Sequence, residues 1–162
     1  MAAITDYVDW VTLAETKVYL RLDDGITESD FEITTMINAA CELVENYTQY
    51  YFKPQTKTYY FNDKGVIRLY AYPITSITET EGFDVDVRQL YSLYSQTDTT
   101  LESIEANIGY SDTDQIKDIF KYAVWETVKL WFYGSESETV IMKGYIPNSV
   151  MSILAPERRF IF

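Results

Sequence analysis

The sequence feature that most constrains the fold is a long stretch in which apolar side chains recur every three or four residues, the spacing of one helix face. Its apolar positions are Ile33, Met36, Ile37, Ala40, Leu43, Val44 and Tyr47. Thr27 followed by Asp30 has the spacing of a capping box, which marks the start of a helix. The pattern predicts a helix over about residues 28–51, the longest element of the chain.

Three more helices are predicted from their start and stop signals. Thr12 with Glu15 has the same capping-box spacing and begins a helix over about residues 12–23. An apolar stripe over about residues 114–133 ends at Gly134, a residue typical of helix C-termini. Pro147 begins a helix over about residues 148–154, and Pro156 stops it before the tail, residues 156–162.

The middle of the chain, about residues 56–110, alternates apolar and polar residues between turn residues, which indicates strands. Segments 56–61 and 66–70 flank a turn at residues 62–65 and are predicted to pair as a hairpin. Further strands are predicted at about residues 74–80, 83–87, 90–94 and 104–110. The predicted fold is mainly α with a β insertion (α+β), a helical bundle with an inserted β-hairpin or small antiparallel sheet. With 162 residues, the chain is expected to form one domain, residues 1–162.

The chain carries 25 acidic and 13 basic residues, for a formal net charge of −12. This balance argues against a protein that grips nucleic acid through its phosphates. Ten of the acids and only three of the bases lie in residues 1–55, so the acidic excess is greatest in the first third. No stretch is apolar enough to span a membrane, and the N-terminus lacks the basic region of a secretion signal. We therefore expect folding in a cytoplasm, without a membrane partner.

Catalytic chemistry has little support, because histidine, the commonest general base and a frequent zinc ligand, is absent. The six glycines form no phosphate-binding loop. Asp84 with Asp86, and Asp23 with Asp24, could hold a hard cation, but in so acidic a chain a solvated surface is the favoured interpretation. Cys41 lies within the long helical pattern and is expected to be a buried, inert thiol. We predict no enzyme, no catalytic or metal site, and no cofactor.

The C-terminal tail places three large apolar side chains beside two cations, after a proline that prevents the helix from continuing. These residues are Arg158, Arg159, Phe160, Ile161 and Phe162. A segment of this kind either folds back on its own core or docks on a partner, for example as an added strand. The residues alone leave both alternatives open.

Several segments carry a resemblance to one protein family. In the first third they are Leu13, Ala14, Lys17, residues 19–23, Glu28, Asp30, residues 37–40, residues 44–48 and Phe52. Later they are residues 72–77, 123–131, 146–147, 153–154, Pro156 and Arg158. In this order they resemble the head-to-tail connector (adaptor) proteins of tailed bacteriophages, which form a ring beneath the portal. The resemblance spans most of the chain, but residues 79–104 match no motif of that family.

The resemblance implies a structural virion protein that assembles into a ring, a dodecamer in the virion. One face of the ring would dock on the portal, and the other would receive a stopper or tail-completion protein. DNA would pass through the central channel without sequence-specific binding. The location implied is the head–tail interface of the virion, after assembly in the host cytoplasm.

Two groups of residues are candidates for the contacts of such a ring. A net charge of −12 per subunit would give a channel that repels phosphates. The candidate channel-lining acids are Asp23, Asp24, Glu28, Asp30 and Glu32, with an outward solvated face as the alternative. The candidates for portal docking are Arg158, Arg159, Phe160, Ile161 and Phe162, with the arginines meeting acidic groups and the phenyl rings filling pockets.

Two other classes of function compete with the connector. An acidic DNA-mimic inhibitor would array carboxylates along a surface, whereas here the acids are mixed with aromatic residues. A small hydrolase with paired carboxylates has no supporting cluster. Size in solution separates the classes, because a ring former should associate at high concentration and the other two need not.

Overall fold

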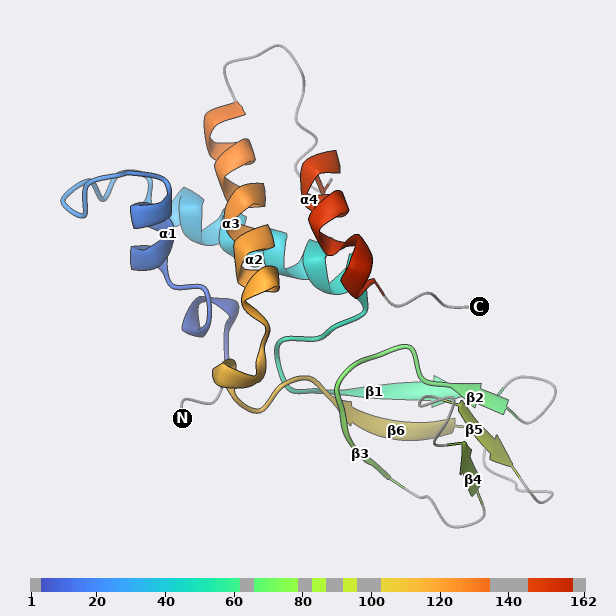
Figure 1. Cartoon of the computed structure of the whole chain (residues 1–162). Coiled ribbons are helices and arrows are strands. Elements are labelled where there is room, and N and C mark those ends of the chain that lie inside the picture. Colours follow the sequence, from blue (N-terminus) through green and yellow to red (C-terminus); the bar gives the residue numbers. More distant parts are fainter. Residues whose placement is uncertain are drawn as a thin grey trace.

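The computed structural model describes residues 4–61, 66–78, 83–86, 92–95, 103–134 and 146–158. Helices gather on one side of the molecule and strands on the other, as Figure 1 shows. The α-helices are α1 (Leu13–Tyr19), α2 (Asp30–Thr48), α3 (Asp118–Tyr133) and α4 (Asn148–Leu154), with short 3-10 helices at Tyr7–Asp9, Thr113–Gln115 and Ala155–Glu157. The strands are β1 (Gln55–Tyr60), β2 (Val66–Arg68), β3 (Ile74–Ile77), β4 (Phe83–Asp86), β5 (Ser92–Ser95) and β6 (Ser103–Ile108). The predicted α+β class is confirmed.

The two predicted capping boxes have different outcomes. At α1, the Thr12 hydroxyl accepts a hydrogen bond from the Glu15 backbone N–H at 3.2 Å, and the Glu15 carboxylate accepts one from the Thr12 N–H at 3.3 Å. At α2 the prediction is wrong, because Ser29 takes the N-cap position and makes no side-chain capping bond. The Asp30 carboxylate instead lies 2.9 Å from the Lys17 ammonium, which a local spacing pattern cannot foresee.

Both α1 and α2 are followed within two residues by a residue with positive φ. α1 ends at Tyr19 rather than near residue 23, and Arg21 follows with φ of 58°. α2 ends at Thr48 rather than near residue 51, and Gln49 follows with φ of 63°. The Gln49 N–H still donates to the Glu45 carbonyl at 2.7 Å, which completes the last turn of α2.

The two C-terminal helices keep close to their predicted bounds. α3 begins at Asp118 rather than near residue 114, because residues Thr113–Gln115 form a 3-10 turn whose N-cap is Asp112. Gly134 caps the end of α3, as predicted. α4 covers the predicted residues, with Pro147 before it and Pro156 in the 3-10 turn that follows.

The strands form two antiparallel three-stranded sheets with the orders β1-β6-β3 and β2-β5-β4. The predicted hairpin between residues 56–61 and 66–70 is wrong, since β1 pairs with β6 and β2 pairs with β5. β6 buries Ile104, Ala106 and Ile108 on one face, and its alternation suits the central strand of a sheet with one covered face. The partner of β1 was therefore decided by a distant apolar strand and not by the nearest turn.

Two clusters of buried side chains hold the fold together. The larger lies between the helices, where α2 and α3 contribute the fully buried Ile33, Ile37, Phe120 and Val124. Phe52, just after α2, joins this cluster, with its ring centroid 5.4 Å from that of Phe120. The smaller cluster underlies the β1-β6-β3 sheet and contains Tyr51, Tyr59, Ile67, Leu69, Ala71, Ile104, Ala106 and Ile108.

Gly109 allows the chain to leave β6 and return to the helices. Its φ of +101° lies in the left-handed region that favours glycine. A Cβ at this position would lie 2.1 Å from the Lys53 carbonyl oxygen. The close approach of these two backbone segments therefore requires glycine, and it fixes where the sheet meets the segment after α2.

Candidate assembly surfaces

The acidic corner, defined as Asp23, Asp24, Glu28, Asp30 and Glu32, lies on the α1–α2 connection and the start of α2. Four of its carboxylates are exposed, and Asp30 is half-buried. In the described part of the chain, none of those four forms an ion pair. The corner is thus a concentrated patch of negative charge at one end of the helical body.

The buried Lys17 side chain holds the α1–α2 connection, which carries part of the acidic corner, in place. Its ammonium donates hydrogen bonds to the carbonyl oxygens of Asp24, at 3.2 Å, and Ile26, at 2.6 Å. The same ammonium forms an ionic contact of 2.9 Å with Asp30, although no well-directed hydrogen bond joins the two groups. Asp30 is therefore partly neutralised within the chain, unlike the other four acids of the corner.

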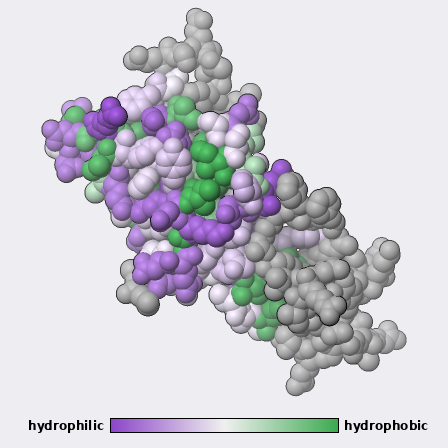
Figure 2. Space-filling model, in the orientation of Figure 1, coloured by the Kyte–Doolittle hydropathy of each residue, from purple (hydrophilic) through white to green (hydrophobic). Residues whose placement is uncertain are grey.

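Large apolar side chains are exposed around the same corner. Val18 on α1 is 69% exposed, and Phe31 on α2 is 86% exposed. Phe31 shares the solvent side of α2 with Thr35, since positions four apart lie on one helix face, and Glu28 lies in the turn before the helix. In Figure 2, hydrophobic residues of the helical part appear as green patches set among hydrophilic ones.

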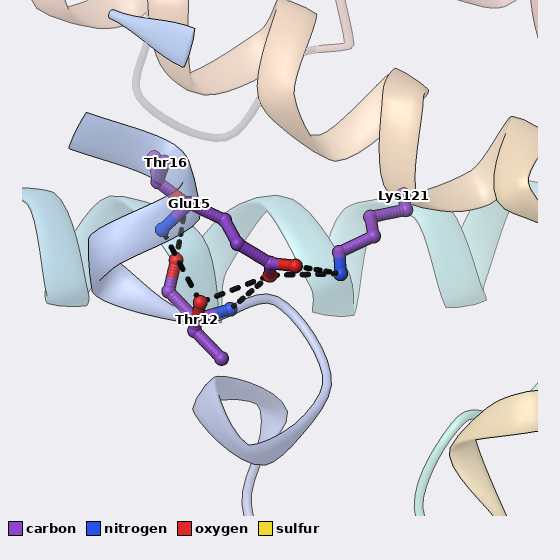
Figure 3. Close-up of polar contacts among 4 residues, drawn as sticks. All are labelled: Thr12, Glu15, Thr16 and Lys121. Atoms are coloured by element: carbon purple, nitrogen blue, oxygen red, sulfur yellow. Dashed lines mark hydrogen bonds and ion pairs between the residues drawn. The ribbon is translucent and has the colours of Figure 1, made fainter. Parts of the chain in front are cut away.

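Polar and aromatic contacts join α1 to α3. The Glu15 carboxylate lies 2.8 Å from the Lys121 ammonium while it still accepts from Thr12, as the close-up in Figure 3 shows. Burial opposes ionisation of Glu15, but Lys121 and Thr12 outweigh it and lower the pKa of this carboxyl. Tyr19 stacks on Trp125 with a centroid distance of 5.2 Å. α1 is thereby held on α3, so the acidic corner has a fixed place on the helical body.

A surface cavity of about 610 Å³ lies at the end of this α1–α3 contact. It is lined by Tyr19, Leu20, Arg21, Lys129 and Tyr133. The Tyr133 hydroxyl donates to the Leu20 carbonyl, and the Tyr19 hydroxyl donates to Glu126. Burial and the nearby Glu126 carboxylate raise the pKa of Tyr19 well above its ordinary value, so its hydroxyl stays protonated.

A second cavity, of about 510 Å³, lies at the C-terminal end of α2, and we name it the lysine–tyrosine pocket. It is lined by Thr5, Tyr7, Glu42, Glu45, Asn46, Tyr51, Lys53, Pro54 and Gln55. The Lys53 ammonium lies 3.8 Å from the centre of the Tyr7 ring, a cation–π contact. Beside the pocket, the Lys57 ammonium donates to the Tyr51 hydroxyl at 2.9 Å.

Glu45 is the buried acid of this pocket. Its Oε2 accepts from the Tyr7 hydroxyl at 2.8 Å, and its Oε1 accepts from the Phe52 backbone N–H at 2.6 Å. Burial raises the pKa of Glu45 above its ordinary value, and the hydrogen bonds and Lys53 oppose that rise only in part. One carboxyl thus joins the N-terminal segment, α2 and the chain that leads into β1.

The predicted portal-docking tail is described only at its first residue. The Arg158 guanidinium lies 4.8 Å from the centre of the Tyr47 ring of α2. The neighbouring Glu157 forms an ion pair of 2.6 Å with Lys117, just before α3. Arg158 therefore lies beside α2, and Glu157 beside the start of α3, whereas Arg159, Phe160, Ile161 and Phe162 lie outside the described residues.

Features that would support catalysis are sparse in the part of the chain that the structure describes. No group of three or more histidine, cysteine, aspartate or glutamate side chains there could hold a metal ion. Cys41 is buried, as predicted, and burial raises its pKa well above the ordinary thiol value. The side chains of Asp84 and Asp86 lie outside the described ones. Within the described residues, no helix is long and apolar enough to cross a membrane.

Three residues of these surfaces were missed by sequence reasoning. Glu45 carried a usable signal, because it follows Ile37 and Cys41 at four-residue steps on the buried face of α2. The exposure of Phe31 could also have been read from the sequence, since this residue falls outside the apolar stripe of its helix. Lys17 had none, because its burial depends on the path of the α1–α2 connection.

No protein-family model matches the sequence, and no curated protein matches it. Three solved structures contain chains with a similar fold, and each comparison covers 99% of this chain and 96% of the other. One is the neck of an empty gene transfer agent (GTA) particle computed with C6 symmetry, with a TM-score of 0.69 and 14% identity. The others are the virion of the native GTA particle, at 0.68 and 12%, and its neck computed with C12 symmetry, at 0.64 and 12%. This chain therefore shares its fold with chains of the GTA neck and virion.

Proposed function

We propose that this chain is a structural subunit of the neck of a phage-like particle, a head-to-tail connector that works as one copy in a ring. The observation that carries the proposal is the extent of the likeness. It covers 99% of this chain and 96% of a chain in the GTA neck, so it includes the helices and the β insertion together. The order of the sequence segments independently resembles the phage connector family.

Cyclic symmetry supports the ring. Two of the similar structures are necks computed with C6 and C12 symmetry, and both symmetries repeat a chain around one axis. A ring of this kind forms when one surface of a subunit binds a different surface of the next and the rotation closes. We propose a dodecamer in the virion, with the portal on one face and a stopper or tail-completion protein on the other.

Electrostatics would let DNA pass through such a ring without adhering. The chain has a net charge of −12, and the acidic corner presents four exposed carboxylates without an intrasubunit cation, Asp23, Asp24, Glu28 and Glu32. Carboxylates on the channel wall repel phosphates and release no counterions on contact, so they oppose binding. Asp30 contributes less to this repulsion, because Lys17 pairs with it.

The tail is the proposed contact with the portal. Arg158 is held against the ring of Tyr47, which gives the following residues a fixed point of departure. From there Arg159 would meet acidic groups, and Phe160, Ile161 and Phe162 would fill apolar pockets of the portal. A role of this kind needs shape and charge rather than catalysis, in line with the proposal that the chain is not an enzyme.

The mass of the purified protein, measured alone and with the portal of the same particle, tests this function. A ring formed alone or only with the portal is the expected result, and the second case would mean that the portal templates assembly. A protein that stays monomeric and does not bind the portal would refute the connector function and favour an acidic DNA-mimic inhibitor. Competition with DNA for a nucleic-acid-binding enzyme would then test that alternative directly.

A further inference from the structure

We propose that neighbouring copies of this chain meet through Phe31 of one copy and the lysine–tyrosine pocket of the next. The inference rests on the ring proposed above and names the contact that would build it. The partner is a second copy of the chain, and the contact joins two different surfaces.

Phe31 has the geometry of an anchor residue. It is 86% exposed in the first turn of α2, whereas Ile33 beside it is fully buried. A lone exposed phenyl ring does not define an interface, because single apolar residues are common on protein surfaces. Phe31 differs in its surroundings, since two exposed acids lie close to it in the chain, Glu28 in the turn before α2 and Glu32 directly after Phe31, and neither forms an ion pair among the described residues.

The lysines of the chain divide into two groups. In the described part, Lys17, Lys117, Lys121 and Lys129 each lie within ion-pair distance of a carboxylate. By contrast, Lys53 and Lys57 face tyrosine rings and have no carboxylate partner there. These two cations, neither within ion-pair distance of a carboxylate among the described residues, therefore complement the two exposed carboxylates near Phe31, which form no ion pair there.

The pocket also suits an aromatic ring. Its volume of about 510 Å³ lies within the range of small-molecule pockets, so it has room for one phenyl group. Tyr7 and Tyr51 line it with largely buried rings, and the Lys53 ammonium lies over the Tyr7 ring at 3.8 Å. The lining carries two carboxyls, the exposed Glu42 and the buried Glu45, and the cations at this site are Lys53 in the lining and Lys57 beside it.

The two surfaces lie at opposite ends of one rigid element. Phe31 is in the first turn of α2, and Glu42, Glu45 and Asn46 of the pocket are in its last turns. α2 has 19 residues, a length of about 28 Å at 1.5 Å per residue. As Figure 1 shows, α2 leads from the α1 side of the molecule to the chain that enters β1. A contact between opposite ends is heterologous, the type that generates a ring.

This placement leaves part of the acidic corner outside the contact. Asp23 and Asp24 lie on the α1–α2 connection, farther along the chain from Phe31 than Glu28, which lies near the end of that connection. They remain available to a channel wall, while Glu28 and Glu32 meet the lysines of the neighbour. The acidic corner would then line the channel with Asp23 and Asp24 and bind the neighbouring copy with Glu28 and Glu32.

Mixing two variants tests the contact directly. Phe31→Ser removes the anchor, and the double variant Lys53→Glu, Lys57→Glu removes the cations of the pocket. Tyr60→Ser is the matched control, because Tyr60 is 73% exposed on β1 and takes no part in the contact. Light scattering under conditions where the wild type forms rings, alone or on the portal, gives the mass of each protein.

The expected result is that each contact variant stays monomeric at about tenfold the concentration at which the wild type and Tyr60→Ser assemble. An equimolar mixture of the two contact variants should form dimers that do not grow, because only one contact per pair is intact. A ring of either contact variant would overturn the inference and leave the connector function standing. A wild type that never assembles, even with the portal, would refute the function and the inference together.

Crosslinking gives a readout that does not depend on the stability of the pocket variant. A benzophenone amino acid in place of Phe31, in an otherwise unchanged chain, should crosslink in the assembled rings to the pocket segments of another copy, residues 5–7 or 42–57. Mixing isotopically labelled and unlabelled protein separates crosslinks between copies from those within one copy. Crosslinks to the portal, to a tail protein or to other parts of a second copy would overturn the proposed contact.

Discussion

Replacement of Glu45 by alanine should destabilise the fold more than any surface substitution. The carboxylate of Glu45 accepts hydrogen bonds from the Tyr7 hydroxyl and the Phe52 backbone N–H, and the residue is buried. Alanine leaves both donors buried without an acceptor, and each such group costs about 1–3 kcal/mol. Loss of the desolvation cost of the carboxylate offsets part of this. We expect Glu45→Ala to lower the free energy of unfolding by about 2–4 kcal/mol.

Glutamine at the same position separates hydrogen bonding from charge. Its amide oxygen can accept from the Phe52 N–H, and its amide N–H can donate to the Tyr7 hydroxyl oxygen. Glu45→Gln should therefore cost less than about 1.5 kcal/mol. Urea unfolding followed by circular dichroism measures both variants, with Glu42→Gln as the control because Glu42 is exposed on the same helix.

The dependence on pH follows from the raised pKa of Glu45. A carboxyl whose pKa is higher in the folded than in the unfolded chain favours folding when it is protonated. Its contribution to stability is complete below the ordinary glutamate pKa, about 4.3, and is lost as the pH rises through the raised pKa. Glu45→Gln has no such loss, so from about pH 4 to pH 7 its stability should rise relative to the wild type.

Three results would contradict this account of Glu45. The first is a cost for Glu45→Ala below about 0.5 kcal/mol, the range of ordinary surface substitutions. The second is an equal cost for alanine and glutamine, which would mean that the hydrogen bonds do not matter. The third is a difference between glutamine and wild type that does not change with pH, since the carboxyl would then titrate alike in both states.

Three further predictions concern local features of the fold. Lys17→Met should cost about 1–3 kcal/mol and speed hydrogen exchange in residues 22–29, because it removes the ammonium that binds the Asp24 and Ile26 carbonyls. Gly109→Ala should lower the unfolding free energy by about 2 kcal/mol or more, measured by thermal unfolding, because φ is +101° and a Cβ would meet a backbone oxygen at 2.1 Å. Cys41 should resist thiol reagents in the native protein and react once urea unfolds it, since burial raises its pKa.

Matched substitutions control these predictions. Lys117→Met removes an ion pair whose lysine side chain is about half exposed, so it should cost less than about 1 kcal/mol. Gly25→Ala should be tolerated, because a Cβ there has only a 3.8 Å contact with an Asp23 carboxylate oxygen. Equal effects of Lys17→Met and Lys117→Met, or of the two glycine substitutions, would refute the local explanations. Rapid labelling of native Cys41 would refute its burial.

Local signals in the sequence predicted the helices well. Proline on both sides of α4 and the Thr12–Glu15 pair before α1 act within a few residues, so the sequence alone is enough to read them. Partner choice was not predictable in this way. The turn at residues 62–65 suggested a hairpin, but Gln55 pairs with Ile108 and Tyr60 with Ser103, because β6 offers a buried apolar face.

The candidate surfaces likewise include features that the local sequence predicts and features that depend on the folded chain. The exposure of the acidic corner was predictable, because a run of carboxylates at a helix start is rarely buried. The exception, Asp30, depends on Lys17, whose burial arises from the folded path of the α1–α2 connection. Which side of the corner faces a neighbour, the portal or DNA depends on surfaces of other chains and remains a proposal.

The pairing of β1 with β6 sets the order in which the chain can fold. β1 ends at Tyr60 and its partner begins at Ser103, so these strands cannot pair until the segment between them has been synthesised. The core between the helices also cannot be completed earlier, because α4 supplies Val150 and Leu154 near the end of this sequence. Contacts so distant in sequence slow folding and leave apolar surface open on the growing chain. The chain can therefore complete its fold only when almost all of this sequence has been made, which makes the finished fold a late event of synthesis.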